Sequence, residues 1–390
     1  MRRQRRGGGI ERATGIAMRQ VFTIVALVAL LSACGRAPVT LHDQSSIPDK
    51  LSEWGIVFAD GQRFRLNDGV VPYDLNTPLF TDYALKLRTV WMPEGKSATY
   101  NDKRELEFPV GTIISKTFHY EKSPGWNAAN FEVVRQDRES GLDTTRQIDL
   151  DTYVLMETRL LVRYEDGWTA LPYVWNNEQN EAFLEVAGDQ WPISLVDASG
   201  SEDIFYIVPD GNQCSGCHVT DHTAKEIRPI GPRAWQLNRG YSWWGNDASQ
   251  LENWSANRLL QGFEGTAPAG VRWSDPGDAT LEQRARAYLD ANCAHCHNPR
   301  GAADTSALHL NIDAPVDRLY GICKTPVAVG RGSGDRPFDI YPGRPEDSIM
   351  IFRMGHTDPA IAMPELGRSA VHTEGLRLVR EWIASLNGEC

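Results

Sequence analysis

Two short segments carry the residue types with the clearest chemistry. The first motif is Cys214-Ser-Gly-Cys217-His218 and the second motif is Cys293-Ala-His-Cys296-His297. In each motif, two thiols separated by two residues can add to the two vinyl groups of a haem, and the following histidine then lies beneath the iron. The pattern predicts two haem c groups. Their covalent anchors are Cys214, Cys217, Cys293 and Cys296, and their axial iron ligands are His218 and His297.

Two other chemistries also use paired cysteines. Two Cys-x-x-Cys pairs can bind one zinc ion through four thiolates. A thioredoxin-like redox site has one such pair at a strand-to-helix junction of a βαβ unit, and the sequence shows no βαβ pattern. Neither chemistry requires a histidine directly after the second cysteine, and both motifs have one. Covalent haem attachment is therefore the favoured interpretation.

The sixth iron ligand of the second haem has a candidate in Met363. It lies in Met363-Pro364, on a predicted loop before the C-terminal helix. A thioether ligand favours ferrous iron and raises the reduction potential. Met354 competes with it, but Met354 lies in a predicted helix, where methionine more often packs in the core. We therefore predict Met363 as a ligand of the haem iron.

The sixth ligand of the first haem stays open. No methionine occurs between Met156 and Met350, and His222 follows His218 too closely to reach the other face of the iron. The remaining options are an open or water-bound position and four residues: His119, Met92, Met156 and Met354. Downstream, Ile230-Gly231-Pro232 resembles the turn whose carbonyl orients the proximal histidine in small cytochromes.

The N-terminus has the order of a secretory signal. An apolar run from Val21 to Leu31 follows Arg19, and it ends in Leu31-Ser-Ala-Cys34, which resembles a bacterial lipobox. We predict a lipoprotein-type signal peptide over residues 1–33, lipidation of Cys34 and a tether over residues 34–50. Gly35 after the cysteine favours the outer membrane. The expected location is the periplasmic side of the bacterial envelope.

Charge limits the range of partners. Without residues 1–33 the chain has 34 Lys+Arg and 50 Asp+Glu, a formal charge of −16. Such an acidic chain is a poor nucleic-acid binder, and it suits contact with basic redox proteins. The expected partners are therefore unidentified redox proteins, together with the membrane through the N-terminal lipid.

Two cysteines remain outside the motifs and the lipobox. Cys323 and Cys390 could form a disulfide in an oxidising compartment. A pair of unlinked thiols is the alternative.

Strand patterns dominate residues 51–208. Residues 111–120 alternate apolar and polar side chains with many β-branched residues, and residues 158–172 predict two strands joined at Glu165-Asp-Gly167. Residues 182–188 and 203–208 continue the pattern. We predict an antiparallel β-sandwich-like domain here.

Helical signals appear after Pro209. Thr280 is a candidate N-cap with Gln283 at the capping-box position, and residues 372–386 have an apolar stripe at helical spacing with Thr373 as the expected cap. We predict a first haem module over residues 209–270 and a second-haem, cytochrome c-like domain over residues 271–390. The expected fold class is therefore α+β multidomain, a β-sandwich-like domain followed by mainly α-helical cytochrome c modules.

Beyond the motifs, several segments resemble an uncharacterised family of bacterial dihaem c-type cytochromes with a β-rich N-terminal domain. They include Pro172-Tyr-Val-Trp-Asn176 and Met363-Pro-Glu-Leu-Gly-Arg368, together with residues 67–82, 212–218, 229–232 and 329–334. The resemblance covers most of residues 51–390, and the C-terminal half is also similar to the cytochrome c domain superfamily. It implies haem binding and electron transfer, without an agreed substrate or partner.

These observations predict a dihaem c-type cytochrome, and they favour an electron carrier over an enzyme. The alternative is a dihaem peroxidase or oxidase that uses the first haem with an open sixth position. No peroxidase-specific distal motif is recognised in the sequence.

Overall fold

Strands overlap residues 111–120, 158–172, 182–188 and 203–208, where β-branched and aromatic residues predicted them. The structure is a computed structural model, and it describes residues 37–136, 147–219, 221–277, 279–327 and 329–390. Cys34 and the predicted signal peptide lie outside the described residues. The strands are β1 (Val57–Ala59), β2 (Arg63–Leu66), β3 (Val71–Tyr73), β4 (Leu85–Trp91), β5 (Ala98–Thr99), β6 (Ile113–Glu121), β7 (Glu132–Val134), β8 (Gln147–Asp149), β9 (Tyr153–Tyr164), β10 (Gly167–Trp175), β11 (Ala182–Leu184), β12 (Asp189–Asp197), β13 (Gly200–Val208) and β14 (Leu260–Gln261).

A six-stranded antiparallel sheet forms the centre of the molecule. Its strand order is β11-β10-β9-β6-β4-β3. The sequence-predicted hairpin is confirmed: β9 and β10 pair from Tyr164 and Gly167 onward, which leaves Glu165 and Asp166 as the loop. Strands β4 and β6 are buried along nearly their whole length, so both faces of this sheet are covered.

Smaller sheets and short helices cover the central sheet. The β13-β12-β7 sheet packs against β6 and β9 through a cluster that includes Phe118, Met156 and Tyr206. Elsewhere, Val90 and Ile114 of the central sheet pack with Trp254 of a short helix. The other sheets are β1-β2-β8 and the parallel pair β14-β5.

The helices are short. The α-helices are α2 (Gly211–His218), α3 (Ala234–Leu237), α4 (Gln250–Ala256), α5 (Leu281–Cys293), α6 (Ile349–Met354) and α7 (Thr373–Ser385). The 3-10 turns are η2 (Leu51–Trp54), η3 (Ser242–Trp244), η4 (Asp304–Ser306), η5 (Gly330–Ser333) and η6 (Pro345–Asp347). The capping box predicted at Thr280 and Gln283 is confirmed at the start of α5. The cap predicted for the last helix is wrong by one residue: α7 begins at Thr373 itself, because His372 holds the N-cap position.

The predicted fold class is wrong. Of the described residues, 26% are in strands of several sheets and 20% are in the six α-helices and the 3-10 turns, so the part after Pro209 is not a set of mainly α-helical cytochrome c modules. The physical reason is that its helices are brief, and glycine and proline interrupt the segments between them. Most of that part is turn and irregular chain.

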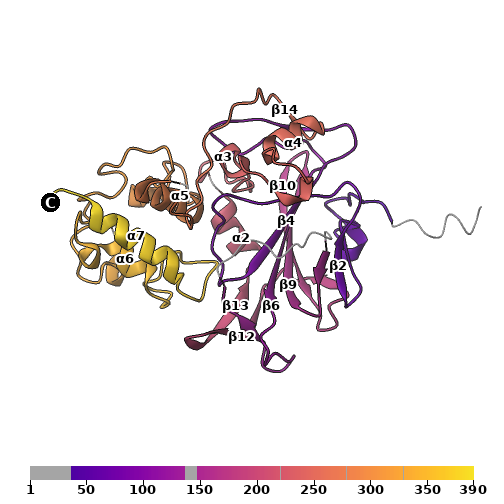
Figure 1. Ribbon diagram of the computed structural model, residues 1–390, viewed down its shortest axis with the longest axis horizontal. Helices are drawn as coiled ribbons and strands as arrows, with labels where there is room; N and C mark the ends of the chain where they lie inside the picture. The colour runs from indigo at the N-terminus through magenta and orange to yellow at the C-terminus, as the bar shows by residue number, and fades with distance from the viewer. Residues whose placement is uncertain (1–36, 137–146, 220, 278, 328) are drawn as a thin grey trace, which may run out of the picture. The chain divides into compact units, whose positions relative to one another are not determined.

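Helices α5, α6 and α7 pack together around the largest apolar cluster of the C-terminal part (Figure 1). Tyr288 and Leu289 of α5 meet Val379, Trp382 and Ile383 of α7 in this cluster.

The chain from Thr40 to Cys390 forms one compact unit, and Ala370 belongs to the apolar cluster of the sheets. The division predicted at residues 208 and 270 stays a prediction. No helix among the described residues has the length and apolar character needed to cross a membrane.

Candidate functional site

Helix α2 positions the first motif. Asp210 accepts a hydrogen bond from the backbone N–H of Gln213, and the Gln213 side chain accepts one from the backbone of Asp210, so the helix begins with a capping box. Cys214, Cys217 and His218 then occupy positions i, i+3 and i+4 of one helix. That spacing places all three side chains on the same face.

The His218 ring is held in one orientation by the backbone. Its Nδ1 lies 2.8 Å from the carbonyl oxygen of Arg228, and burial lowers the pKa of His218 to about 4. A neutral imidazole whose Nδ1–H donates to a carbonyl leaves Nε2 as the lone-pair nitrogen for a metal. The sequence expected this carbonyl in Ile230-Gly231-Pro232. The structure places it at Arg228, and the Gly231–Pro232 pair borders the nearby cavity instead.

The second motif has the same local geometry. Helix α5 ends at Cys293, and the backbone N–H groups of Cys296 and His297 donate to the Cys293 carbonyl at 3.1 and 2.9 Å, which adds one more helical turn. His297 Nδ1 lies 3.1 Å from the Ser306 hydroxyl. Burial lowers the pKa of His297 to about 4, so this imidazole is also neutral at physiological pH.

The two motifs touch. The Cys296 thiol donates to the carbonyl oxygen of Gly216, at an Sγ–O distance of 3.6 Å. The first motif and Cys293 of the second also border one cavity of about 250 Å³, with Tyr288 and His372 among its other lining residues. Residues far apart in sequence therefore form one site.

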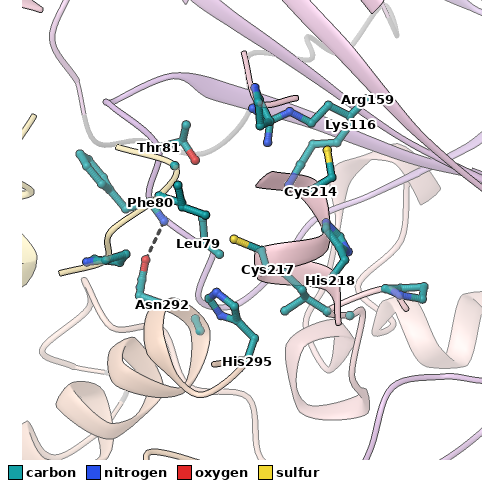
Figure 2. Close-up of a pocket in the computed structure, with 18 of the residues that line it drawn as sticks. Leu79, Phe80, Thr81, Lys116, Arg159, Cys214, Cys217, His218, Asn292 and His295 are labelled. Carbon is teal, nitrogen blue, oxygen red and sulfur yellow. Dashed lines mark hydrogen bonds between the residues drawn. The ribbon is translucent and has the colours of Figure 1, made fainter. Parts of the chain in front are cut away.

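Figure 2 shows how side chains enter this cavity from different elements. Cys217 and His218 extend from α2, while His295 extends toward the same space from the turn after α5. Phe80 lies nearby, and its backbone N–H donates to the Asn292 side chain at 2.8 Å. This bond fixes the segment before β4 against α5.

Both candidate methionines border the cavity. Met354 is the last residue of α6, and Met363 lies on the following loop. The backbone N–H of Met363 donates to the carbonyl of Arg353 at 3.1 Å, so the loop lies directly against the helix end. The assignment of Met363 as the ligand stays a prediction.

The residues considered for the first haem mostly lie elsewhere. Met92 and Met156 are buried in apolar clusters of the sheets and do not border the cavity. His119 is buried within β6, with its ring centroid 5.5 Å from that of Tyr153, and it does not border the cavity either. His222 is exposed. Of the four candidates, Met354 alone borders the cavity.

Sequence reasoning missed a row of three cations on the central sheet. Arg88, Lys116 and Arg159 are direct cross-strand partners on β4, β6 and β9, and all three border the cavity. Like charges opposite each other destabilise a sheet unless they are compensated. Register across three strands creates this row, so no single stretch of sequence reveals it.

The three cations are compensated unequally. The guanidinium of Arg159 donates to Glu157 through Nε at 2.7 Å, and Arg88 lies 3.5 Å from Asp74. Lys116 forms no ion pair with any carboxylate of the described residues, and its amine lies 5.1 Å from the centroid of the Phe118 ring. Burial and the two arginines lower the pKa of Lys116 to about 7.

A second missed residue is His295, inside the second motif. It is 6% exposed, and its Nδ1 is buried without a hydrogen-bond partner among the described residues. Burial lowers its pKa to about 3. A buried polar group without a partner costs about 1–3 kcal/mol, so such a group calls for an explanation. In the sequence, His295 occupies one of the two variable positions of the motif, where no particular residue type is required.

Zinc and thiol redox chemistry fit this site poorly. No three His, Cys, Asp or Glu side chains among the described residues converge as a metal-binding group. Burial raises the pKa of Cys214 and Cys217, and it raises the pKa of Cys293 and Cys296 to about 12. Redox-active cysteines need the thiolate, which these surroundings disfavour.

The donor set does fit haem c. Each motif supplies two unlinked thiols on one helical face and one neutral imidazole whose Nδ1 is engaged. Haem iron takes a single protein ligand on each axial side, so it does not need the convergent three-residue group that zinc would need.

The remaining two cysteines are joined. Cys323 and Cys390 form a disulfide bond, which links the segment before η5 to the end of the chain.

Comparison with known proteins adds no assignment: no family model, curated protein or solved structure matches this chain. The resemblance to dihaem cytochromes therefore stays a prediction from the motifs.

Proposed function

We propose that the chain is a dihaem c-type cytochrome that transfers electrons on the periplasmic side of the bacterial envelope. Haem c groups would be attached at the first and second motifs, and a lipid on Cys34 would anchor the protein, with the outer membrane as its expected location. Unidentified redox proteins are its expected partners, and nucleic acid is not.

The observation that carries this proposal is the common geometry of the two motifs. In both, cysteines and histidine lie at i, i+3 and i+4, and the histidine Nδ1 is engaged by Arg228 or Ser306 so that Nε2 is left for iron. The contact between Cys296 and Gly216 then supports electron exchange between two neighbouring haems.

A bound haem supplies one-electron chemistry between ferric and ferrous iron. The side chains of this protein have defined tasks around it. His218 and His297 would each bind the iron of one haem, and Met363 is the expected further ligand of the second haem. The cation row places positive charge at the cavity. Positive charge there would favour ferrous over ferric iron, and it would suit the anionic propionates of a haem.

The proposal is tested on the mature protein, produced with the machinery that attaches haem c. Mass spectrometry and haem absorbance should give two haems for each chain. A chain that lacks covalent haem despite intact cysteines would overturn the proposal.

EPR of the oxidised protein, recorded with and without peroxide, separates the carrier from the alternative. Two low-spin haems that do not react with peroxide support a carrier. A high-spin haem that reacts supports a dihaem peroxidase or oxidase with an open sixth position at the first haem.

A further inference from the structure

The buried ring of His295 has no role in the proposed function as described so far. His295 lies within the second motif, but it is neither an attachment cysteine nor the proximal histidine of that motif. Yet His295 borders the cavity, and its Nδ1 is buried without a hydrogen-bond partner among the described residues. A buried polar atom without a partner calls for an explanation, and an absent ligand or ion at the cavity is one.

The position of His295 connects it with the first motif. Its ring extends toward Cys217 and the space in front of α2 (Figure 2), and it shares the cavity with Cys217 and His218. The thiol of the next residue, Cys296, reaches Gly216 between the two cysteines of the first motif. The turn that carries His295 is therefore packed directly against the first motif.

We propose that His295 is the sixth ligand of the first haem iron, opposite His218. The inference rests on the proposed function, because it requires a haem at the first motif. It would give the His295 imidazole a role at this cavity and would fill the ligand position for which the sequence offered no candidate near the first motif. The second motif would then serve both haems: its cysteines and His297 hold one, and His295 holds the other.

Lys116 is the main competitor, since its amine also borders the cavity without a carboxylate partner among the described residues. Its place in the row with Arg88 and Arg159 gives it another role, as part of a positive surface. His295 lies in the turn that packs directly against the first motif, whereas Lys116 extends from the central sheet. These differences favour His295 as the ligand.

The test compares H295A with wild type in the mature, haem-loaded protein. Wild type should show two low-spin ferric haems by EPR. H295A should lose half of the low-spin intensity and gain one high-spin haem, and added imidazole should restore the low-spin state. His222→Ala, which removes an exposed histidine, is the matched control and should leave both haems unchanged.

A second variant keeps the proposal testable if H295A is unstable. H295M supplies a thioether in place of the imidazole, so near-infrared magnetic circular dichroism should detect one more methionine-ligated haem than in wild type, with a higher potential for the first haem. The same method on wild type should show bis-histidine ligation at one haem.

Several outcomes would overturn the inference. One is a wild-type protein whose first haem is already high-spin. Another is an H295A protein with two unchanged low-spin haems. A third is a Lys116→Gln variant that loses the low-spin signal while H295A does not. In each of these outcomes the protein still carries two covalent haems. A protein without covalent haem would instead overturn the proposed function.

Discussion

The two motifs have the same local geometry and different surroundings. In both, a helical turn places two thiols and an imidazole on one face. The first motif, however, borders a β-sheet with three cations in a row, and its histidine is oriented by a backbone carbonyl. The second lies among helices and a methionine loop, and its histidine is oriented by a hydroxyl. Local sequence thus specifies attachment, while tertiary packing sets the electrostatics and the ligands.

The largest expected effect comes from removing the attachment cysteines of one motif at a time. C214A/C217A should lose one haem and leave the spectrum of the second unchanged. C293A/C296A should lose one haem and also disturb the other, because His295 lies between the two replaced residues. Mass spectrometry measures the loss of haem, and EPR measures the state of the haem that remains. If both variants left the remaining haem equally unchanged, or disturbed it equally, the predicted difference between the motifs would be wrong.

A difference in covalent support should appear in stability. The Cys323–Cys390 disulfide closes a loop with a sequence separation of 67, which belongs to the part of the chain with the second motif. Loss of such a loop constraint costs about 4 kcal/mol. C323S/C390S should therefore lower the free energy of unfolding by about that amount, measured by urea denaturation, with the absorbance of the second haem changing first. Equal stability with and without the bond would contradict this account.

Asp82 links the sheet to the segment after Met363. Its carboxylate accepts hydrogen bonds from the backbone N–H groups of Ser369 and Ala370, at 2.7 and 2.8 Å. Burial nevertheless raises the pKa of Asp82 from 3.8 to about 6. The folded state thus holds this proton more tightly than the unfolded chain, and the stabilisation present below pH about 4 is lost as the pH rises through about 6.

Urea denaturation between pH 4 and 6 should therefore show an unfolding free energy that falls by up to about 3 kcal/mol through this group. D82N should flatten that part of the profile. The exposed Asp197, whose pKa is lowered, provides the control D197N. A D82N profile with the wild-type slope would show that Asp82 does not titrate in this range.

The cation row should act on the first haem alone. Removing the charge of Lys116 with K116Q should lower the potential of that haem by roughly 50–100 mV, because a nearby positive charge stabilises the ferrous form. Lys122 is a half-buried lysine directly after β6, and it does not border the cavity. K122Q should therefore leave the potentials of both haems unchanged. An equal shift of both potentials in K116Q would contradict an effect on the first haem alone.

The smallest expected effect concerns the second haem. Ser306 accepts from His297 Nδ1 and so makes the imidazole a stronger donor to ferric iron. S306A should raise the potential of the second haem by about 40 mV, the equivalent of one hydrogen bond of about 1 kcal/mol. Spectroelectrochemistry measures the shift, with S385A on α7 as the control. A shift in the potential of the first haem would show that the Ser306 hydroxyl does not act on the second haem alone.

Local features of the structure were predictable from the sequence. The capping box at Thr280 and the hairpin loop at Glu165 and Asp166 follow from neighbouring residues, and both are present. The fold class failed because isolated helical patterns after Pro209 were extended into whole helical modules. Periodicity identifies a helix where it occurs, and it does not specify what the chain between helices does.

Long-range features of the site were out of reach. The pairing of Lys116 with both Arg88 and Arg159 depends on strand register. The approach of His295 to the first motif depends on how the turn after α5 packs against α2. Residue types alone cannot supply either relation, since both join segments that are distant along the chain.

The contact between Cys296 and Gly216 also bears on how the protein would be assembled. Where the two motifs meet, Cys214 is buried and the other three thiols are half-buried, so haem attachment at both motifs would require room between packed elements. Both thioether pairs would therefore be made while the exported chain is still open. Closure of the fold around two haems would then be the last step of biogenesis, and a chain that closed early would be excluded from maturation.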